Sequence, residues 1–219
     1  MISNLPFRTL LLATFACALV RSQPLNVQLT GMHPGDTAVG YKGTQRIVYL
    51  GNLAAHSLLK STDDGVHWLH LSISNPLAVA CRPRNADVVY VGRFDRGGVG
   101  MWKSEDGGNT FFEINAGFTN PMPVKIAVSP HDQNLIYVGC YHARGLPSLF
   151  RSENGGSSWS EVRPFGSREL TITSIVFDSS DSQRLWISGQ GADHNDTGDW
   201  MTMDGGNTWV QKVRGPHNP

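Results

Sequence analysis

The sequence predicts an all-β chain built from four-stranded antiparallel blades, the architecture of a β-propeller. A short turn-forming box that ends in an aromatic residue occurs four times, at intervals of 43, 48 and 50 residues. Short β-branched and aromatic runs, which are typical of strands, precede and follow each box. A repeat of about 40 to 50 residues is the length of one propeller blade. Four blades are therefore expected.

Each box has the composition of a tight hairpin turn. It begins with a hydroxyl residue, has Asp or Asn two residues later, and has glycine before the closing aromatic. Asp and Asn accept bonds from backbone N–H groups two residues on, the leading hydroxyl can bond across the hairpin, and glycine adopts positive φ without strain. We therefore expect structural staples rather than catalytic acids. The box residues are Ser61, Asp63, Gly65 and Trp68; Ser104, Asp106, Gly108 and Phe111; Ser152, Asn154, Gly156 and Trp159; and Thr202, Asp204, Gly206 and Trp209.

The strands of each repeat are expected in a fixed order around the box. A run of five residues that ends in glycine forms the second strand, at 47–51, 88–92, 135–139 and 185–189. An apolar run at 77–81, 124–128 or 173–177 forms the first strand of the later repeats, whereas the first repeat offers only 25–29 and 38–39. A third strand enters the box and a fourth leaves it. The blades are expected at about 25–72, 73–116, 117–165 and 166–214, with no helix and no division into further domains.

Residues 1–22 are predicted to be a signal peptide, and 23–219 the propeller. Arg8 precedes the apolar stretch 10–20, and a small-residue cleavage site ends at Ser22. The apolar stretch is too short to span a membrane. The mature chain is thus expected to be secreted, either extracellular or, in a bacterium, periplasmic.

Charge and motifs exclude several classes of function. After cleavage the chain would carry 16 Lys and Arg against 18 Asp and Glu, and this balance disfavours nucleic acid as a partner. Cys81 and Cys140 are expected as free thiols, because nothing in the pattern places them within bridging distance. No phosphate cradle, zinc spacing or nucleophile elbow occurs. We expect no cofactor and no metal.

With boxes, strands and spacing together, residues 44–213 resemble the Asp-box (BNR) β-propeller superfamily, which includes sialidases, xyloglucanase-type glycoside hydrolases, sortilin ectodomains and photosystem II assembly-factor-like proteins. The Tyr-Val-Gly unit, followed by Trp-Lys-Ser-Glu-Asp-Gly-Gly at 102–108, is most similar to the xyloglucanase and sortilin branches. The resemblance implies the fold more strongly than the activity. The sialidase motifs are missing, and Tyr49, Tyr90 and Tyr137 are expected inside strands. Xyloglucanase catalysis would need a cleft between two large propellers.

The loops between the second and third strands are expected to form a binding rim, on the opposite face from the boxes. Loops on a rigid scaffold often carry binding residues, and mixed charge with imidazoles suits a glycan or a peptide. The acidic run at 193–196 fits no standard calcium loop. The candidate residues are His56, Arg93, Asp95, Arg96, Tyr141, His142, Arg144, Asp193, His194 and Asp196.

The sequence therefore favours a secreted, non-catalytic binding module for a glycan or a protein ligand. The alternatives are a truncated xyloglucanase-like glycoside hydrolase and a sortilin-like protein-binding fragment. Propellers of this resemblance usually have six or more blades, so the four here predict an open arc, and the segment 25–29 is similar to a strand that would complete a final blade. The two ends of this open arc would expose apolar surface and allow self-association.

Overall fold

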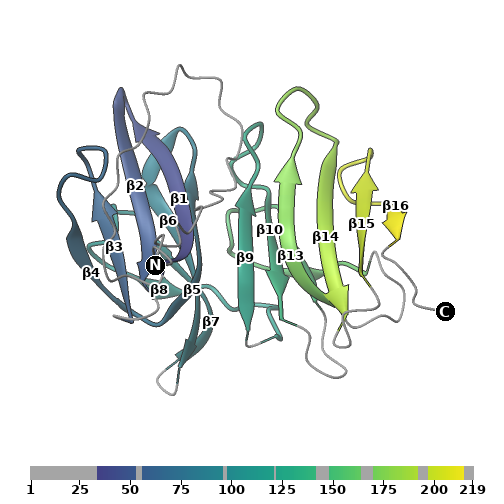
Figure 1. Ribbon diagram of the computed structural model, residues 1–219, viewed down its shortest axis with the longest axis horizontal. Helices are drawn as coiled ribbons and strands as arrows, with labels where there is room; N and C mark the ends of the chain where they lie inside the picture. The colour runs from purple at the N-terminus through teal and green to yellow at the C-terminus, as the bar shows by residue number, and fades with distance from the viewer. Residues whose placement is uncertain are drawn as a thin grey trace, which may run out of the picture.

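The computed structural model describes residues 34–52, 56–95, 98–120, 122–141, 148–163, 170–191 and 197–214. These residues form four antiparallel four-stranded sheets, and none of them lies in a helix. The sheets follow one another along the chain and stand side by side as blades 1 to 4 (Figure 1). The predicted all-β propeller fold is confirmed.

In each blade the four strands pair in the order of the sequence. Blade 1 contains β1 (Pro34–Lys42), β2 (Gln45–Asn52), β3 (Ser57–Ser61) and β4 (Leu69–Ser74). Blade 2 contains β5 (Pro76–Arg82), β6 (Asn85–Asp95), β7 (Gly98–Ser104) and β8 (Phe112–Glu113). Blade 3 contains β9 (Pro123–Val128), β10 (Ile136–Cys140), β11 (Leu149–Ser152) and β12 (Ser160–Glu161). Blade 4 contains β13 (Leu170–Phe177), β14 (Leu185–Gly191), β15 (Thr197–Thr202) and β16 (Val210–Arg214).

The second strand of blade 2, β6, has an apolar run at 88–91 because both of its faces are covered there. Along β6 the side chains alternate between two clusters: Val89 and Val91 pack against blade 1, whereas Val88 and Tyr90 pack against blade 3. All four side chains are buried. A continuous apolar run, rather than an alternating one, is what burial on both faces requires.

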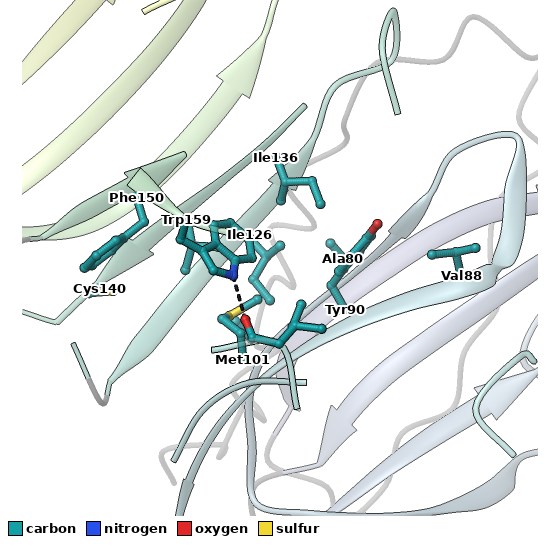
Figure 2. Packing of buried hydrophobic residues seen from close by; sticks show 12 residues of the cluster. Ala80, Val88, Tyr90, Met101, Ile126, Ile136, Cys140, Phe150 and Trp159 are labelled. Atoms are coloured by element: carbon teal, nitrogen blue, oxygen red, sulfur yellow. Dashed lines mark hydrogen bonds between the residues drawn. The ribbon is translucent and has the colours of Figure 1, made fainter. Parts of the chain in front are cut away.

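The joint between blades 2 and 3 shows how neighbouring blades pack. Phe150 and Trp159 of blade 3 and Tyr90 of blade 2 lie in one cluster (Figure 2). The indole nitrogen of Trp159 donates a hydrogen bond of 2.7 Å to the backbone C=O of Ile114, drawn as the dashed line in Figure 2. The ring of Phe118 stands edge-on to Trp159 at 5.7 Å. Packing and a buried hydrogen bond therefore act together at this joint.

A buried tyrosine on the second strand of each of the first three blades reaches the next blade. The hydroxyl of Tyr49 donates to the C=O of Ala86 at 2.8 Å, and that of Tyr90 donates to the C=O of Gly155 at 3.3 Å. Tyr137 makes the same kind of bond with Gly205 of blade 4 at 3.1 Å. Burial raises the pKa of Tyr137 to about 12, so the hydroxyl stays protonated and able to donate.

The strand register corrects the expected alignment of blade 4. The five-residue runs ending in glycine would place Ile187 at the tyrosine position. In the structure Leu185 pairs with Thr202 as Ile136 pairs with Ser152. The position after Leu185, which is that of Trp186, is therefore equivalent to Tyr137. The equivalence is set by the register of β14 against β15, and no composition signal marks it.

Blade 1 and blade 4 lie at opposite ends of the molecule (Figure 1). The three apolar clusters join blades 1 and 2, blades 2 and 3, and blades 3 and 4. The described strands thus form an open arc. The first strand of blade 1 is β1, which contains Ala38; the segment 25–29 and the predicted signal peptide lie outside the described residues.

Candidate functional site

The box hydroxyl organises its own turn. In each box its oxygen accepts a bond from the N–H four residues on and donates to the Asp or Asn side chain two residues on, so it does not bond across the hairpin as expected. The N–H bonds run from Gly65 to Ser61, Gly108 to Ser104, Gly156 to Ser152 and Gly206 to Thr202, at 2.8 to 2.9 Å. Since all four boxes share this bond, it defines the turn.

The box carboxylate bonds further along the chain than Asx-turn chemistry predicts. Asp106 Oδ1 accepts the N–H of Thr110, four residues on, at 2.9 Å, and Oδ2 accepts the hydroxyl of Thr110 at 2.7 Å. Asn154 makes the equivalent backbone bond with Ser158. The expectation of a bond two residues on was therefore wrong. The N–H two residues on, that of Gly108, bonds to the hydroxyl of Ser104 instead.

Two consecutive residues in every box have positive φ. They are Gly107 and Gly108 in the second box, with φ of 74° and 92°. In the first box Asp64 takes the leading position with φ of 61°. Its carboxylate accepts a bond from Arg46 at 2.5 Å. Asp tolerates the left-handed region better than most residues, which explains why this box functions with one glycine.

The box carboxylates are held ionised. The hydroxyl and N–H of Thr110 lower the pKa of Asp106 to about 2, and Thr208 does the same for Asp204. In Asp63 the N–H of His67 is the main cause, with the imidazole second. A general acid needs a raised pKa. These three carboxylates are thus suited to holding a turn and unsuited to donating a proton.

The closing aromatic is not equally buried in the four boxes. Trp159 is buried in the joint between blades 2 and 3, whereas Trp68, Phe111 and Trp209 are only half-buried. The indole of Trp209 donates within its own box, to the C=O of Gly206 at 3.1 Å. Trp159 is therefore the box aromatic with the largest share in the core.

The second strands of the blades end at the edge opposite the boxes, because each box connects the third strand to the fourth. Three of the expected rim residues are described there. His56 precedes β3 with φ of 50° and is exposed. Arg93 lies in β6, where its guanidinium stacks on Trp102 at 4.8 Å and donates to Ser74. Tyr141 follows β10 and is 42% exposed.

Phe94 is an exposed rim residue that sequence reasoning missed. It lies in β6, beside Arg93 in sequence, and is 46% exposed. An aromatic in a strand run is expected to be buried, so its composition gave no signal; only the position near the strand end could have suggested it. Phe94 and Tyr141 thus place an exposed aromatic at the same edge of neighbouring blades.

The side chains of the other expected rim residues are not described. Asp95 is the last residue of β6, and its side chain is not described. The remaining residues lie outside the described part of the chain: Arg96, His142, Arg144, Asp193, His194 and Asp196.

Asp36 connects the inner strands of three blades. Its carboxylate accepts the N–H of Val79 in β5 at 3.4 Å and lies 3.6 Å from the amine of Lys125 in β9. Burial raises the pKa of Asp36, while Lys125 acts in the opposite direction. The contacts of Asp36 with Val79 and Lys125 thus link the inner strands of blades 1 to 3. The composition of 25–42 did not indicate them.

A shallow hollow of about 420 Å³ lies at the joint between blades 3 and 4, near the boxes. Arg151 and Glu153 line it and form an ion pair of 2.6 Å. His131 lines it as well and contacts the C=O of Asp178 at 3.0 Å. These three lining side chains thus already have partners.

Cys81 and Cys140 are both free and buried, in different clusters. Burial raises the pKa of the Cys81 thiol to about 12, so it is unreactive at neutral pH. Within the described residues, no group of His, Cys, Asp and Glu could hold a metal ion. That same part of the chain contains no helix long and apolar enough to cross a membrane.

No protein-family model and no curated protein matches the sequence. Among solved structures, the fold is similar to that of a GH74 enzyme from Niastella koreensis, with a TM-score of 0.57 and 18% identity over 83% of this chain and 38% of that one. A chain of a nidogen–laminin complex gives a TM-score of 0.59 and 11% identity over 84% and 64%. A GH74 xyloglucanase from Xanthomonas campestris gives 0.48 and 15% over 81% and 38%.

The first two similarities, whose TM-scores exceed 0.5, show the β-propeller fold. This chain spans between 38% and 64% of the length of those three chains. At such low sequence identity the similarity does not extend to activity, because propellers host many unrelated functions.

Proposed function

We propose that this chain is a secreted, non-catalytic binding module that takes a glycan or a protein segment on the rim opposite the boxes. It would belong to the Asp-box superfamily that its repeats resemble. The observation that carries the proposal is the pair of exposed aromatics, Phe94 and Tyr141, at the same edge of two neighbouring blades. An exposed aromatic face suits a sugar ring or an apolar side chain.

Hydrogen bonds hold the backbone beneath these aromatics. The N–H of Tyr141 donates to the C=O of Met122 at 2.9 Å, and its C=O accepts the side-chain amide of Asn120 at 3.2 Å. The strand that carries Phe94 is anchored by Arg93, which bonds to Ser74 and stacks on Trp102. A ligand would therefore lose little binding energy to the ordering of the protein.

Binding is favoured over hydrolysis by the state of the carboxylates. Glycoside hydrolysis by a pair of carboxyl groups needs one with a raised pKa to act as the acid. The described carboxyl whose pKa is raised is Asp36, and it is occupied by Lys125 and Val79. The box carboxylates have lowered pKa values because they accept hydrogen bonds within their own turns.

The test is an array of glycans and peptides probed with labelled wild type and with the Phe94→Ala/Tyr141→Ala variant. We expect the wild type to bind one class of ligand and the variant to lose that binding while its melting temperature is unchanged. Release of reducing sugar from a bound glycan would support the hydrolase alternative instead. Binding that both proteins share would contradict the rim as the site.

A further inference from the structure

The face of blade 4 that is turned away from blade 3 has no described blade against it. We refer to such a face as a forward face, because in blades 1 to 3 it contacts the following blade. The register of blade 4 places Val176, Trp186, Met201 and Val210 opposite one another in a single row across this face. Val213 lies on the same face, opposite Asp199.

The equivalent rows of the other blades have a different chemistry. Each contains a small residue, a tyrosine and a cation, followed by a variable fourth residue. The rows are Ala38, Tyr49, Lys60 and Leu69; Ala80, Tyr90, Lys103 and Phe112; and Ala127, Tyr137, Arg151 and Ser160. In blade 4 the row is apolar at every position.

In blades 2 and 3 the cation of the row also has a partner in its own box. Lys103 pairs with Glu105 at 2.7 Å, and Arg151 pairs with Glu153 at 2.6 Å. In blade 4 the two equivalent positions are Met201 and Met203. An ion pair on this face has thus been replaced by two methionines, which are adaptable residues common on binding surfaces.

The blade 4 patch is defined as Val176, Trp186, Met201, Met203, Val210 and Val213. Apart from Met201, which is buried, its members are 39 to 59% exposed. The contrast with the other blades is sharpest at Trp186, which is 39% exposed where Tyr49, Tyr90 and Tyr137 are 0% exposed. A contiguous exposed apolar patch of this kind marks an interaction site.

An ordinary following blade does not match this patch. The forward faces of blades 1 to 3 need backbone acceptors on the next blade: the amine of Lys60 donates to the C=O of Gly107 at 2.9 Å, and the tyrosine hydroxyls donate likewise. The blade 4 row has neither the tyrosine hydroxyl nor the cation, and its one side-chain donor is the indole N–H of Trp186. A partner for this row is therefore mainly apolar.

We propose that the blade 4 patch packs against the same patch of a second copy of this chain, around a two-fold axis. In such a contact each residue near the axis faces its own equivalent. A lysine or arginine at the Met201 position would face another cation, whereas methionine packs against methionine without repulsion. This surface is separate from the proposed ligand rim, and the inference does not depend on it.

The size of the patch predicts a reversible association. A face of four short strands is smaller than the roughly 800 Å² that each partner buries in a standard stable interface. The uncharged centre is flanked on the same face by Ser174, Ser188 and Asp199, which form a polar border. We therefore expect a monomer–dimer equilibrium that depends on concentration.

The experiment is sedimentation velocity on the wild type and on Met201→Lys/Met203→Glu, from micromolar to near-millimolar protein. The double substitution restores the ion pair that blade 2 contains, so the blade should fold. We expect the wild type to shift toward twice the monomer mass and the variant to remain monomeric. Val210→Lys, a single change on the outer strand, should also keep the protein monomeric. It replaces the double variant in the experiment if that variant does not fold.

Two control substitutions locate the contact. Val66→Lys changes an apolar side chain in the first box that is 72% exposed, and Val39→Lys changes an exposed side chain of β1 on blade 1. Both should dimerise as the wild type does. A wild type that stays monomeric throughout, or a dimer that survives the patch variants, would overturn the proposal. Loss of the dimer in Val39→Lys would indicate a head-to-tail contact and would overturn it as well.

Discussion

Replacing Ser104 with alanine tests the role of the box hydroxyl. Ser104 is 0% exposed. Its oxygen accepts the N–H of Gly108 at 2.8 Å and that of Asp106 at 3.3 Å, and it donates to Asp106 Oδ1 at 2.8 Å. Alanine removes all three bonds at nearly constant volume, so the effect reports hydrogen bonding rather than packing.

The magnitude follows from which group is left without a partner. Gly108 is buried, and a buried N–H without an acceptor costs about 1 to 3 kcal/mol. Asp106 is exposed, so water replaces its lost partner and adds little. We expect the free energy of unfolding to fall by about 2 kcal/mol, which corresponds to a melting temperature lower by roughly 4 to 8 °C in a domain of this size.

The assay is urea unfolding followed by tryptophan fluorescence, with Ser104→Thr as the matched control. Thr202 occupies the same position in the fourth box and makes the same three bonds, at 2.7, 2.8 and 3.3 Å. The threonine variant should therefore unfold close to the wild type. An unchanged midpoint in Ser104→Ala, or an equal loss in both variants, would refute the hydroxyl as the centre of the turn.

Three further predictions concern the core, the joints and pH. Trp159→Ala should lower the free energy of unfolding by about 3 to 5 kcal/mol, because the ring is buried and its N–H is bonded. Trp68→Ala, at a half-buried box position, should lower it by less than half as much in the same denaturant titration. Tyr90→Phe removes only the hydroxyl that donates to Gly155 and should cost about 1 to 2 kcal/mol by thermal unfolding, and a melting temperature at or above that of the wild type would count against this bond. The pKa of Asp106 is lowered to about 2, so its contribution to stability is complete above about pH 4 and is lost as the pH falls toward 2. In acid titrations at fixed urea, Asp106→Asn should lose less stability than the wild type over that range, since Asn154 shows that an amide can hold the same turn. An identical loss in the two proteins would exclude the carboxylate as a cause.

The strand order could be predicted because local composition and burial agree. The run 88–92 is apolar on both faces, and the structure buries both faces of β6. Four repeats also indicated the period, since each box marks the same hairpin. A single copy would not have done so.

The details that sequence reasoning missed depend on register. The equivalence of Trp186 and Tyr137 arises from the register of β14 against β15, and a one-residue shift moves a side chain to the other face. The exposure of Phe94 likewise depends on where β6 ends relative to its neighbours. Such features arise from strand pairing, which composition does not specify.

The same limit applies to the hydrogen bonds of the box. Ser104 and Asp106 were expected in the turn from their residue types. Which N–H each oxygen accepts is set by two consecutive positive φ angles, at Gly107 and Gly108. Those angles place the N–H of Thr110, rather than that of Gly108, within reach of the carboxylate.

The most direct test of the central claim, a binding module with structural boxes, is a calorimetric titration with the strongest array ligand. Wild type, Phe94→Ala/Tyr141→Ala and Ser104→Ala would be compared at a temperature where all three are folded. We expect the rim variant to bind at least about tenfold more weakly, which is a loss of about 1.4 kcal/mol, and Ser104→Ala to bind as the wild type does. Unchanged affinity in the rim variant, together with lost affinity in the box variant, would contradict the account.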